Sequence, residues 1–433
     1  MSSRWIDQSP ETEVVPATAV KTSVSSASTD AEIPSAKCLY TTLGSVEQQL
    51  HVINNGDATP QWWGLRIQAE EDDADVSMVK VGTPDAASLL YSLDDGKTWT
   101  SFDADGGTTV NLPHVGDYVC FKAGVSGNTK ISKSDNDYRK FTLSKKCGAY
   151  GNVMSLLDGT DDETATAATM GDYCFRALFS GSKITTAPEF PASTLSDYCY
   201  DNAFSACEYL VTPMTALPAL SVPQYAYRSM FYNCTALTTA PEINATSVGM
   251  YGCLYMFYGC SALVAAPQLS VTTLGYCCMA WMFRNCTSLT AAPDLPATGR
   301  LAVSGTHIGS AYLGMFYGCS ALVTAPDIGL EVFGVSTCEQ MFRYCTSLAS
   351  CEFKFGGSLY ETPGVLAYCF DGCSSLSSLV VHFTGWYIGY GTNATAYWVR
   401  GVSSSGTFYC PAALNTSSPG NYKNPSGWTV VNI

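Results

Sequence analysis

Apolar positions recur at a fixed distance over more than half of the chain, and this repetition predicts the architecture. Between residues 148 and 380 a Phe is followed three residues later by Cys in copy after copy. Counted from Phe179 of a degenerate first copy, successive Phe positions differ by 25, 27, 26, 26, 33, 26 and 28 residues. A period of about 26 residues over eight units is typical of a solenoid of stacked coils. The repeated pairs are Phe204 with Cys207, Phe231 with Cys234, Phe257 with Cys260, Phe283 with Cys286, Phe316 with Cys319, Phe342 with Cys345, and Phe370 with Cys373.

Each unit combines a turn with a short strand. Phe, Cys and Leu at intervals of three residues would share one face of a single helical or 3₁₀ turn. Leu237, Pro241 and Ile243 then fall on even spacing, as in a short strand with one face directed inward. So small a unit cannot bury its own apolar face, whereas stacked copies can, so we expect each Phe and Cys to lie inside the stack.

The remaining parts of the chain have different patterns. Residues 61–147 contain short alternating segments separated by Gly, Asp and Pro, which predicts an antiparallel β-sandwich. Residues 1–60 have no period and predict an extended N-terminal arm that needs an anchor. Residues 381–433 lose the period but stay aromatic and strand-like, as a cap over the last coil of a solenoid at 148–380 requires. The fold class is therefore mainly β with short helical turns.

Charge and composition restrict the partners and the compartment. The 433 residues include 22 basic and 37 acidic ones, and the net charge of -15 repels nucleic acid and anionic membranes. No apolar run approaches the roughly 18 residues of a membrane span, so we expect no membrane insertion. The N-terminus lacks the pattern of a secretory signal. Nineteen cysteines, an odd number, indicate folding in a reducing cytosol with free thiols.

The repeated Cys has four chemical interpretations. A catalytic Cys needs a dedicated base, but the chain has only four histidines for seven repeats. Zinc favours a C-x-x-C pair, which does not occur, so we expect no metal and no cofactor. Disulfides between neighbouring coils satisfy the Cα spacing, but would turn the side chains out of the core. Free Cys behaves as a small buried hydrophobe, and we therefore interpret the column as a core ladder.

The stretches "MFYGCSAL", "MFYNCTALTTAPEI" and "MFRNCTSLTAAPDLPAT" resemble the BspA-like leucine-rich repeat family over roughly residues 170–380. The resemblance implies a right-handed solenoid used for adhesion or recognition. Such repeats occur on the surfaces of gut and oral bacteria and in phages of those hosts.

A second resemblance is local. Residues 92–99, "SLDDGKTW", are similar to the Asp-box of sialidase propellers. Physically the pattern predicts a β-hairpin in which Asp94 caps the turn, Gly96 adopts positive φ and Trp99 packs beneath. Glycan hydrolysis is a distant alternative, because it needs two opposed carboxylates and the pair Asp161 and Glu163 lies in a loop-like segment. We expect no catalytic residues.

Candidate binding residues lie at two places in the repeat. The residue after each repeat Phe should point outward, where Tyr and Arg offer ring faces and donors to a ligand or pack against the next coil. One coil is longer by seven residues, and insertions in solenoids often form the binding face. The candidates are Tyr232, Tyr258, Arg284, Tyr317 and Arg343 after the Phe, and Arg300 and His307 in the long coil.

Together these features predict a non-enzymatic structural or adhesion protein of a bacteriophage particle, assembled in the host cytoplasm. Residues 1–60 would join it to other virion proteins, and the solenoid would face a glycan or protein of the host surface. A bacterial cell-surface adhesin with the same binding physics is the alternative. A homo-oligomer is left open.

Overall fold

The computed structural model of the chain describes residues 64–159, 170–295, 300–301, 309–328, 334–356, 359, 363–386 and 393–433, with the backbone alone at 300 and 301. These residues all belong to one compact unit, Trp62–Ile433. The predicted arm at 1–60, the pair Asp161 and Glu163, and His307 lie outside the described residues.

Antiparallel strands form two sheets in the N-terminal part, and alternation of apolar and polar side chains places one face of each strand inside. A six-stranded sheet has the order β4-β3-β6-β1-β8-β9, and a three-stranded sheet has the order β5-β2-β7. The strands are β1 (Arg66–Ala69), β2 (Ala74–Val81), β3 (Leu89–Ser92), β4 (Thr100–Phe102), β5 (Thr109–Leu112), β6 (Tyr118–Ala123), β7 (Tyr138–Leu143) and β8 (Cys147–Tyr150), followed by the short helix α4 (Ser155–Asp158).

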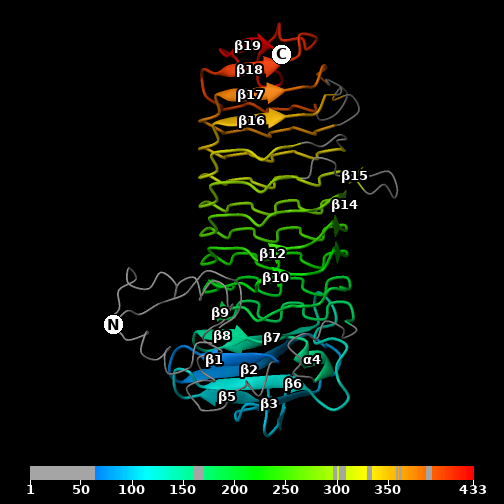
Figure 1. Cartoon of the computed structure of the whole chain (residues 1–433), viewed down its shortest axis with the longest axis vertical. Helices are drawn as coiled ribbons and strands as arrows, with labels where there is room; N and C mark the ends of the chain where they lie inside the picture. The colour runs from blue at the N-terminus through cyan, green and yellow to red at the C-terminus, as the bar shows by residue number, and fades with distance from the viewer. Residues whose placement is uncertain are drawn as a thin grey trace, which may run out of the picture. The chain divides into compact units, whose positions relative to one another are not determined.

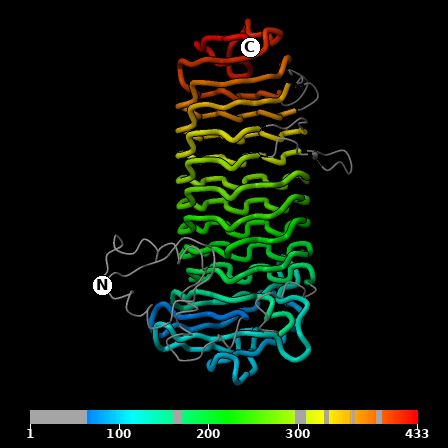
Figure 2. Tube along the Cα trace, viewed as in Figure 1, coloured from blue at the N-terminus to red at the C-terminus, as the bar shows by residue number. Residues whose placement is uncertain are grey.

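Parallel pairing begins at β9 (Ile184–Thr186) and continues coil by coil toward the C-terminus (Figure 1). Single parallel bridges such as Thr239 with Ala265 join coils where no strand is long enough to be assigned. Figure 2 shows the coils as successive layers. The remaining strands are β10 (Ala216–Leu217), β11 (Ser221–Val222), β12 (Glu242–Ile243), β13 (Ser247–Val248), β14 (Thr273–Leu274), β15 (Arg300–Leu301), β16 (Ser350–Phe353), β17 (Ser378–Val381), β18 (Thr407–Cys410) and β19 (Thr429–Asn432).

The predicted fold class is confirmed: antiparallel sheets are followed by a β-solenoid with strands at its C-terminal end. Pairs in the central sheet are offset by one repeat, as Ser221 with Ser247 and Ser247 with Thr273 show. This offset equals the period of the sequence, so residues at equivalent positions of the repeat pair with one another in neighbouring coils.

Each coil begins with a turn segment, for example residues 225–234, whose amides alternate between two kinds of hydrogen bond. The amides of Arg228 and Met230 donate to the carbonyl three residues earlier, at 3.2 and 3.3 Å. The amides of Ser229 and Phe231 donate instead to carbonyls of the next coil, both at 2.9 Å. A left-handed φ recurs at every fourth residue, 57° at Tyr225 and 53° at Ser229. The segment therefore has the three-residue spacing of a 3₁₀ turn without being a continuous helix.

The repeat Phe side chains form one column of stacked rings inside the solenoid. From Phe179 to Phe370 each ring lies 5.3–5.7 Å from the next, with interplanar angles of 0–6°. All seven repeat Phe residues and their Cys partners are fully buried. Aromatic stacking adds about 0.5–1.5 kcal/mol per pair beyond burial, so the column contributes along the whole stack.

The repeat Cys does more than fill space. The Sγ of Cys260 donates to the Phe231 carbonyl of the preceding coil at 3.0 Å, and all seven ladder cysteines make the equivalent bond at 2.9–3.1 Å. The same Phe carbonyl accepts the amide of the Cys within its own coil, as from Cys234 to Phe231 at 3.1 Å. Both lone pairs of a buried carbonyl are thus satisfied, one by each of two coils. All eighteen cysteines of the described residues are free thiols and buried.

The column of rings starts before the first repeat. Phe141 in β7 stacks on Phe179 at 5.3 Å, and its amide donates to the Leu178 carbonyl at 2.7 Å. Phe231 makes the same bond to the residue preceding the next repeat Phe, so β7 occupies the place of a coil. Strand β8 pairs in parallel with β9 at the same junction. The sheets therefore close the N-terminal end of the stack. The stacking continues across residue 147, where the sequence predicted a boundary between the sandwich and the solenoid.

The stacking also runs past residue 380. The pair Trp398-Val399 takes the place of Cys369-Phe370, because the Phe370 amide donates to the Trp398 carbonyl at 2.7 Å. The following segment lies over this last coil and accepts two of its indole hydrogen bonds, from Trp398 to the Lys423 carbonyl and from Trp386 to the Asn415 carbonyl. Val399 and Val402 stand where the repeat has Phe and Cys. The sequence motif is therefore absent from this coil, although the coil geometry persists.

The thiol hydrogen bond gives a first prediction. Cys260→Ala should lower the free energy of unfolding by about 1–2 kcal/mol through the cavity it leaves. Cys253, buried in the neighbouring column, donates no side-chain hydrogen bond among the described residues and serves as the matched control. Cys260→Ala should cost about 0.5 kcal/mol more than Cys253→Ala, since a thiol is a weak donor. Urea unfolding measures the free energy of unfolding of both variants. An equal loss in the two would show that the thiol hydrogen bond does not contribute to stability.

Burial of the thiols predicts how stability depends on pH. Burial raises the pKa of Cys207 and of Cys278 to about 12, whereas an unfolded thiol titrates near pH 8.5. Between these values the unfolded chain loses protons that the folded chain keeps, so stability is full below about pH 8.5 and falls as pH rises. The urea midpoint, measured with reductant present, should drop steeply between pH 8 and pH 10. A constant midpoint would contradict the reduced, buried ladder.

Candidate functional site

The outward residues of the turn segments form one surface, here named the turn face. In residues 225–234 the side chains follow a period of four, with two residues inside and two toward the outside, although the small Ser229 is itself buried. The outward pair consists of the left-handed residue and the residue before it, as in Tyr232 and Asn233. Because coils repeat in register, outward residues of successive coils lie in columns.

Most of the predicted Tyr and Arg residues contact one another along this face. Tyr232 and Tyr258 stack at 4.7 Å with an interplanar angle of 15°. Arg343 lies over Tyr317, 5.8 Å from the ring centroid. All of Tyr232, Tyr258, Arg284, Tyr317 and Arg343 are half-buried. Tyr232 and Tyr258 thus pack against the neighbouring coil, the alternative in the sequence analysis, and each stays partly exposed.

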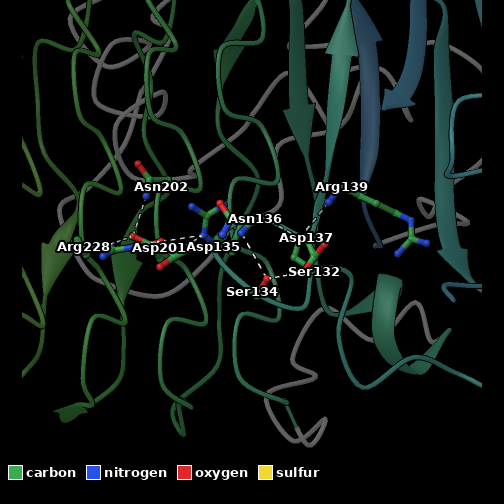
Figure 3. A network of polar contacts seen from close by, with 10 residues as sticks. Ser132, Ser134, Asp135, Asn136, Asp137, Arg139, Asp201, Asn202 and Arg228 are labelled. Carbon is green, nitrogen blue, oxygen red and sulfur yellow. Dashed lines mark hydrogen bonds and ion pairs between the residues drawn. The ribbon is translucent and has the colours of Figure 1, made fainter. Parts of the chain in front are cut away.

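Near the N-terminal end of the face, a carboxylate is held between two arginines. Asp201 is fully buried and lies 3.1 Å from Arg176 of the preceding coil and 2.7 Å from Arg228 of the following coil. Asp135, in the loop before β7, contacts the same two arginines at 3.2 and 2.9 Å. Figure 3 shows how this network links the loop of residues 132–137 to the coils.

The same arrangement recurs near the C-terminal end. Asp371, whose side chain is 5% exposed, lies 2.9 Å from Arg343 and 2.6 Å from Arg400. Each triad, Arg176–Asp201–Arg228 and Arg343–Asp371–Arg400, joins three successive coils. Sequence reasoning identified only Arg343. The first triad lies in the column four residues earlier, whereas Asp371 and Arg400 lie in the column of Arg343 but beyond the central coils that the prediction covered.

Between the triads lies a group named here the central cluster: Tyr255, Tyr258, Trp281, Arg284 and Tyr317. The guanidinium carbon of Arg284 is 4.1 Å from the Tyr317 ring centroid, 4.7 Å from that of Trp281 and 5.5 Å from that of Tyr258. The Nε of Arg284 is buried and has no hydrogen-bond partner. No ion pair of Arg284 occurs among the described residues. The cluster thus presents a cation enclosed by aromatic rings.

A glycine shapes the central cluster. Gly314 has φ of 55°, and a Cβ built there would lie 1.9 Å from Cζ3 of Trp281. The indole therefore occupies the space beside the next coil where a side chain would otherwise lie. Trp281 itself adopts a left-handed φ of 56°. Trp281 and Tyr255 were not predicted as site residues, although their position three residues before the outward Tyr or Arg is readable from the period of four.

The long coil is described only in part. The backbone of Arg300 pairs in parallel with Thr273 in the sheet that contains β14 and β15. The side chain of Arg300 and all of His307 are outside what the structure describes. Their role in binding stays a prediction.

The segment 92–99 forms the turn between β3 and β4, which pair antiparallel. A hydrogen bond from Ser92, with others from Thr98, lowers the pKa of Asp94 to about 2. Gly96 has φ of 81°, and Lys122 lies over the half-buried Trp99 ring at 4.2 Å. These contacts describe a hairpin turn held by its own side chains.

The described residues contain no group of three or more His, Cys, Asp or Glu that could hold a metal ion. In the same part of the chain, no helix is both long and apolar enough to cross a membrane.

The coil geometry places the chain in the class of β-solenoid repeat proteins. No protein-family model matches the sequence, and no curated protein does. Among solved structures, a leucine-rich repeat protein from Bacteroides ovatus is similar, with 12% identity over 80% of this chain and 99% of that chain, and a TM-score of 0.18. Since a TM-score this low carries no argument, the class rests on the stacked coils themselves.

The buried carboxylate of the first triad gives a prediction about stability. Asp201→Asn removes the charge between Arg176 and Arg228 and should cost about 3 kcal/mol, because the two arginines then share only the more exposed carboxylate of Asp135. Asp135→Asn changes the same network at a side chain that is 48% exposed and should cost less than about 1 kcal/mol. Urea unfolding of both variants measures the difference. Equal costs would mean that the triad does not hold the coils together.

Proposed function

We propose that the chain is a non-enzymatic recognition protein that binds its ligand on the turn face of the solenoid. The observation that carries this proposal is the central cluster, where a guanidinium without a carboxylate partner among the described residues lies between aromatic rings. Such a group can accept an anion or an amphipathic surface without rearranging the coil.

Rigidity supports a binding role. The cluster residues lie on turn segments whose backbone is bonded to both neighbouring coils, as the amides of Tyr255 and Trp281 show at 3.1 and 2.7 Å. A preorganised surface loses little conformational entropy on binding, so weak contacts suffice for useful affinity.

The polar groups of the triads support a non-catalytic role for this face. Asp201 and Asp371 are each enclosed between two arginines, which holds them as structural counterions. Catalysis by a carboxylate pair would instead need two carboxyl groups open to a substrate between them.

For the location, we propose a bacteriophage particle, with residues 1–60 joining the chain to other virion proteins and the solenoid directed at a host glycan or protein. Eighteen buried free thiols are compatible with folding in the reducing cytosol where a virion is assembled. A bacterial cell-surface adhesin is the second candidate, and it would use the same face.

Deletion of residues 1–60 tests the anchoring role. The described core begins at residue 64 and lies within the unit Trp62–Ile433, so the shortened chain should fold with an unchanged melting temperature. It should no longer co-sediment with particles from lysed cells, whereas the full chain should be found in them by mass spectrometry. Equal incorporation of both chains, or export of the full chain to a bacterial surface, would overturn the virion proposal.

A further inference from the structure

We propose that the central cluster is a subsite for a single carboxylate group of a glycan, with Arg284 as its anchor. This inference rests on the proposed binding function and specifies its ligand. The ligand class is a glycan carrying an isolated acidic sugar within a mostly neutral chain.

The first argument is the difference between Arg284 and the other arginines of the turn face. Arg176, Arg228, Arg343 and Arg400 each contact a buried carboxylate. Arg284 has the same kind of position in its coil as Arg343 and Arg400, yet it has no carboxylate partner among the described residues, and its Nε is buried without an acceptor. A half-buried cation without a counterion is costly, and a bound anion would remove that cost.

The second argument is geometry. Rings of Tyr317, Trp281 and Tyr258 lie within 4.1–5.5 Å of the guanidinium carbon and limit its freedom. Because Nε is buried, the two Nη groups are the donors left for a ligand. Their fixed, planar pair matches the two oxygens of a carboxylate, and such charge-assisted pairs are about twice as strong as neutral hydrogen bonds.

The third argument restricts the ligand by charge. The chain has a net charge of -15, so a polyanion such as nucleic acid or a highly sulfated polysaccharide meets repulsion over most of the surface. One carboxylate placed on Arg284 avoids this repulsion. The ring edges and hydroxyl groups of Tyr255 and Tyr258, both half-buried, suit the mixed apolar and hydroxyl surface of a sugar.

The rings beside Arg284 meet edge to face. Tyr232 and Tyr258 are nearly parallel at 15°, whereas Trp281 and Tyr317 meet at 64° and Tyr317 and Tyr344 at 87°. Parallel stacking covers ring faces on both sides, and an edge-to-face contact does not. The contact of Trp281 with Tyr317 beside Arg284 therefore differs in ring orientation from the parallel contact of Tyr232 with Tyr258.

The test uses the full chain and matched oligosaccharides. We expect sialyllactose to bind at least tenfold more tightly than lactose, which has the same neutral part, in titration calorimetry. Arg284→Gln should reduce sialyllactose affinity at least tenfold, about 1.4 kcal/mol. Arg284→Lys keeps the charge and loses the planar fork, so it should recover only part of the affinity. Lys97→Gln changes the net charge equally at an exposed position of the hairpin turn, away from the turn face, and should bind as the parent does.

The outcomes separate this inference from the proposed function. Labelled full chain is also tested for binding to whole bacterial cells. If cells or neutral glycans bind and Arg284→Gln has no effect, the subsite is wrong and the recognition role stands. If neither cells nor glycans bind the parent chain, the recognition role itself fails. Binding of a glutamate-rich peptide through Arg284, without binding of sialyllactose, would overturn the glycan class. Melting temperatures within a few degrees of the parent show that each variant is folded.

Discussion

About half of the backbone amides in each turn segment have no acceptor in their own coil, and the rest of the structure depends on how these amides are satisfied. They donate to the carbonyls of the next coil, so a coil is complete only when another lies beside it. The stack must therefore be closed by something that is not a repeat. Strand β7 supplies that closure at the N-terminal end, with Phe141 in the position of a repeat Phe. At the other end the segment that follows β18 covers the last coil.

This constraint explains why the motif contains Met, Phe and Cys where it does. The pairs of inward residues recur every four positions, and the Cys both closes its own turn through its amide and reaches the preceding coil through its thiol. A left-handed φ at bulky residues such as Tyr225 is unfavourable by itself, by about 1–2 kcal/mol. Hydrogen bonds to both neighbouring coils offset that strain, so the conformation is maintained by the stack and not by local preference.

The repeat period, the parallel stacking and the inward Phe and Cys could be predicted from the sequence, because each is repeated seven times. Phe141 and Trp398 could not, since each occurs once and in a different local sequence. The turn geometry was predicted only as a three-residue spacing, because the left-handed residues belong to many types, among them Tyr, Ser, Asn, Ala, Trp, Cys, Gln and Gly. The outward column after Phe could be predicted, and the period of four would also have placed Trp281 on the outward face. The contacts within the triads could not be predicted, since they depend on which side chains of three coils come together.

Ligand binding on this scaffold depends on which charged groups of the described turn face have no counterion in a neighbouring coil. Two triads use their charges to hold coils together, and between them Arg284 is enclosed by rings without such a partner among the described residues.

The most direct test of the continuous stack is amide hydrogen exchange of the full chain, resolved by peptide mass spectrometry. If sheets and coils form one stack, residues 138–150 and 170–182 should exchange slowly and with common protection. Complete exchange of 138–150 while 170–182 stays protected would contradict it.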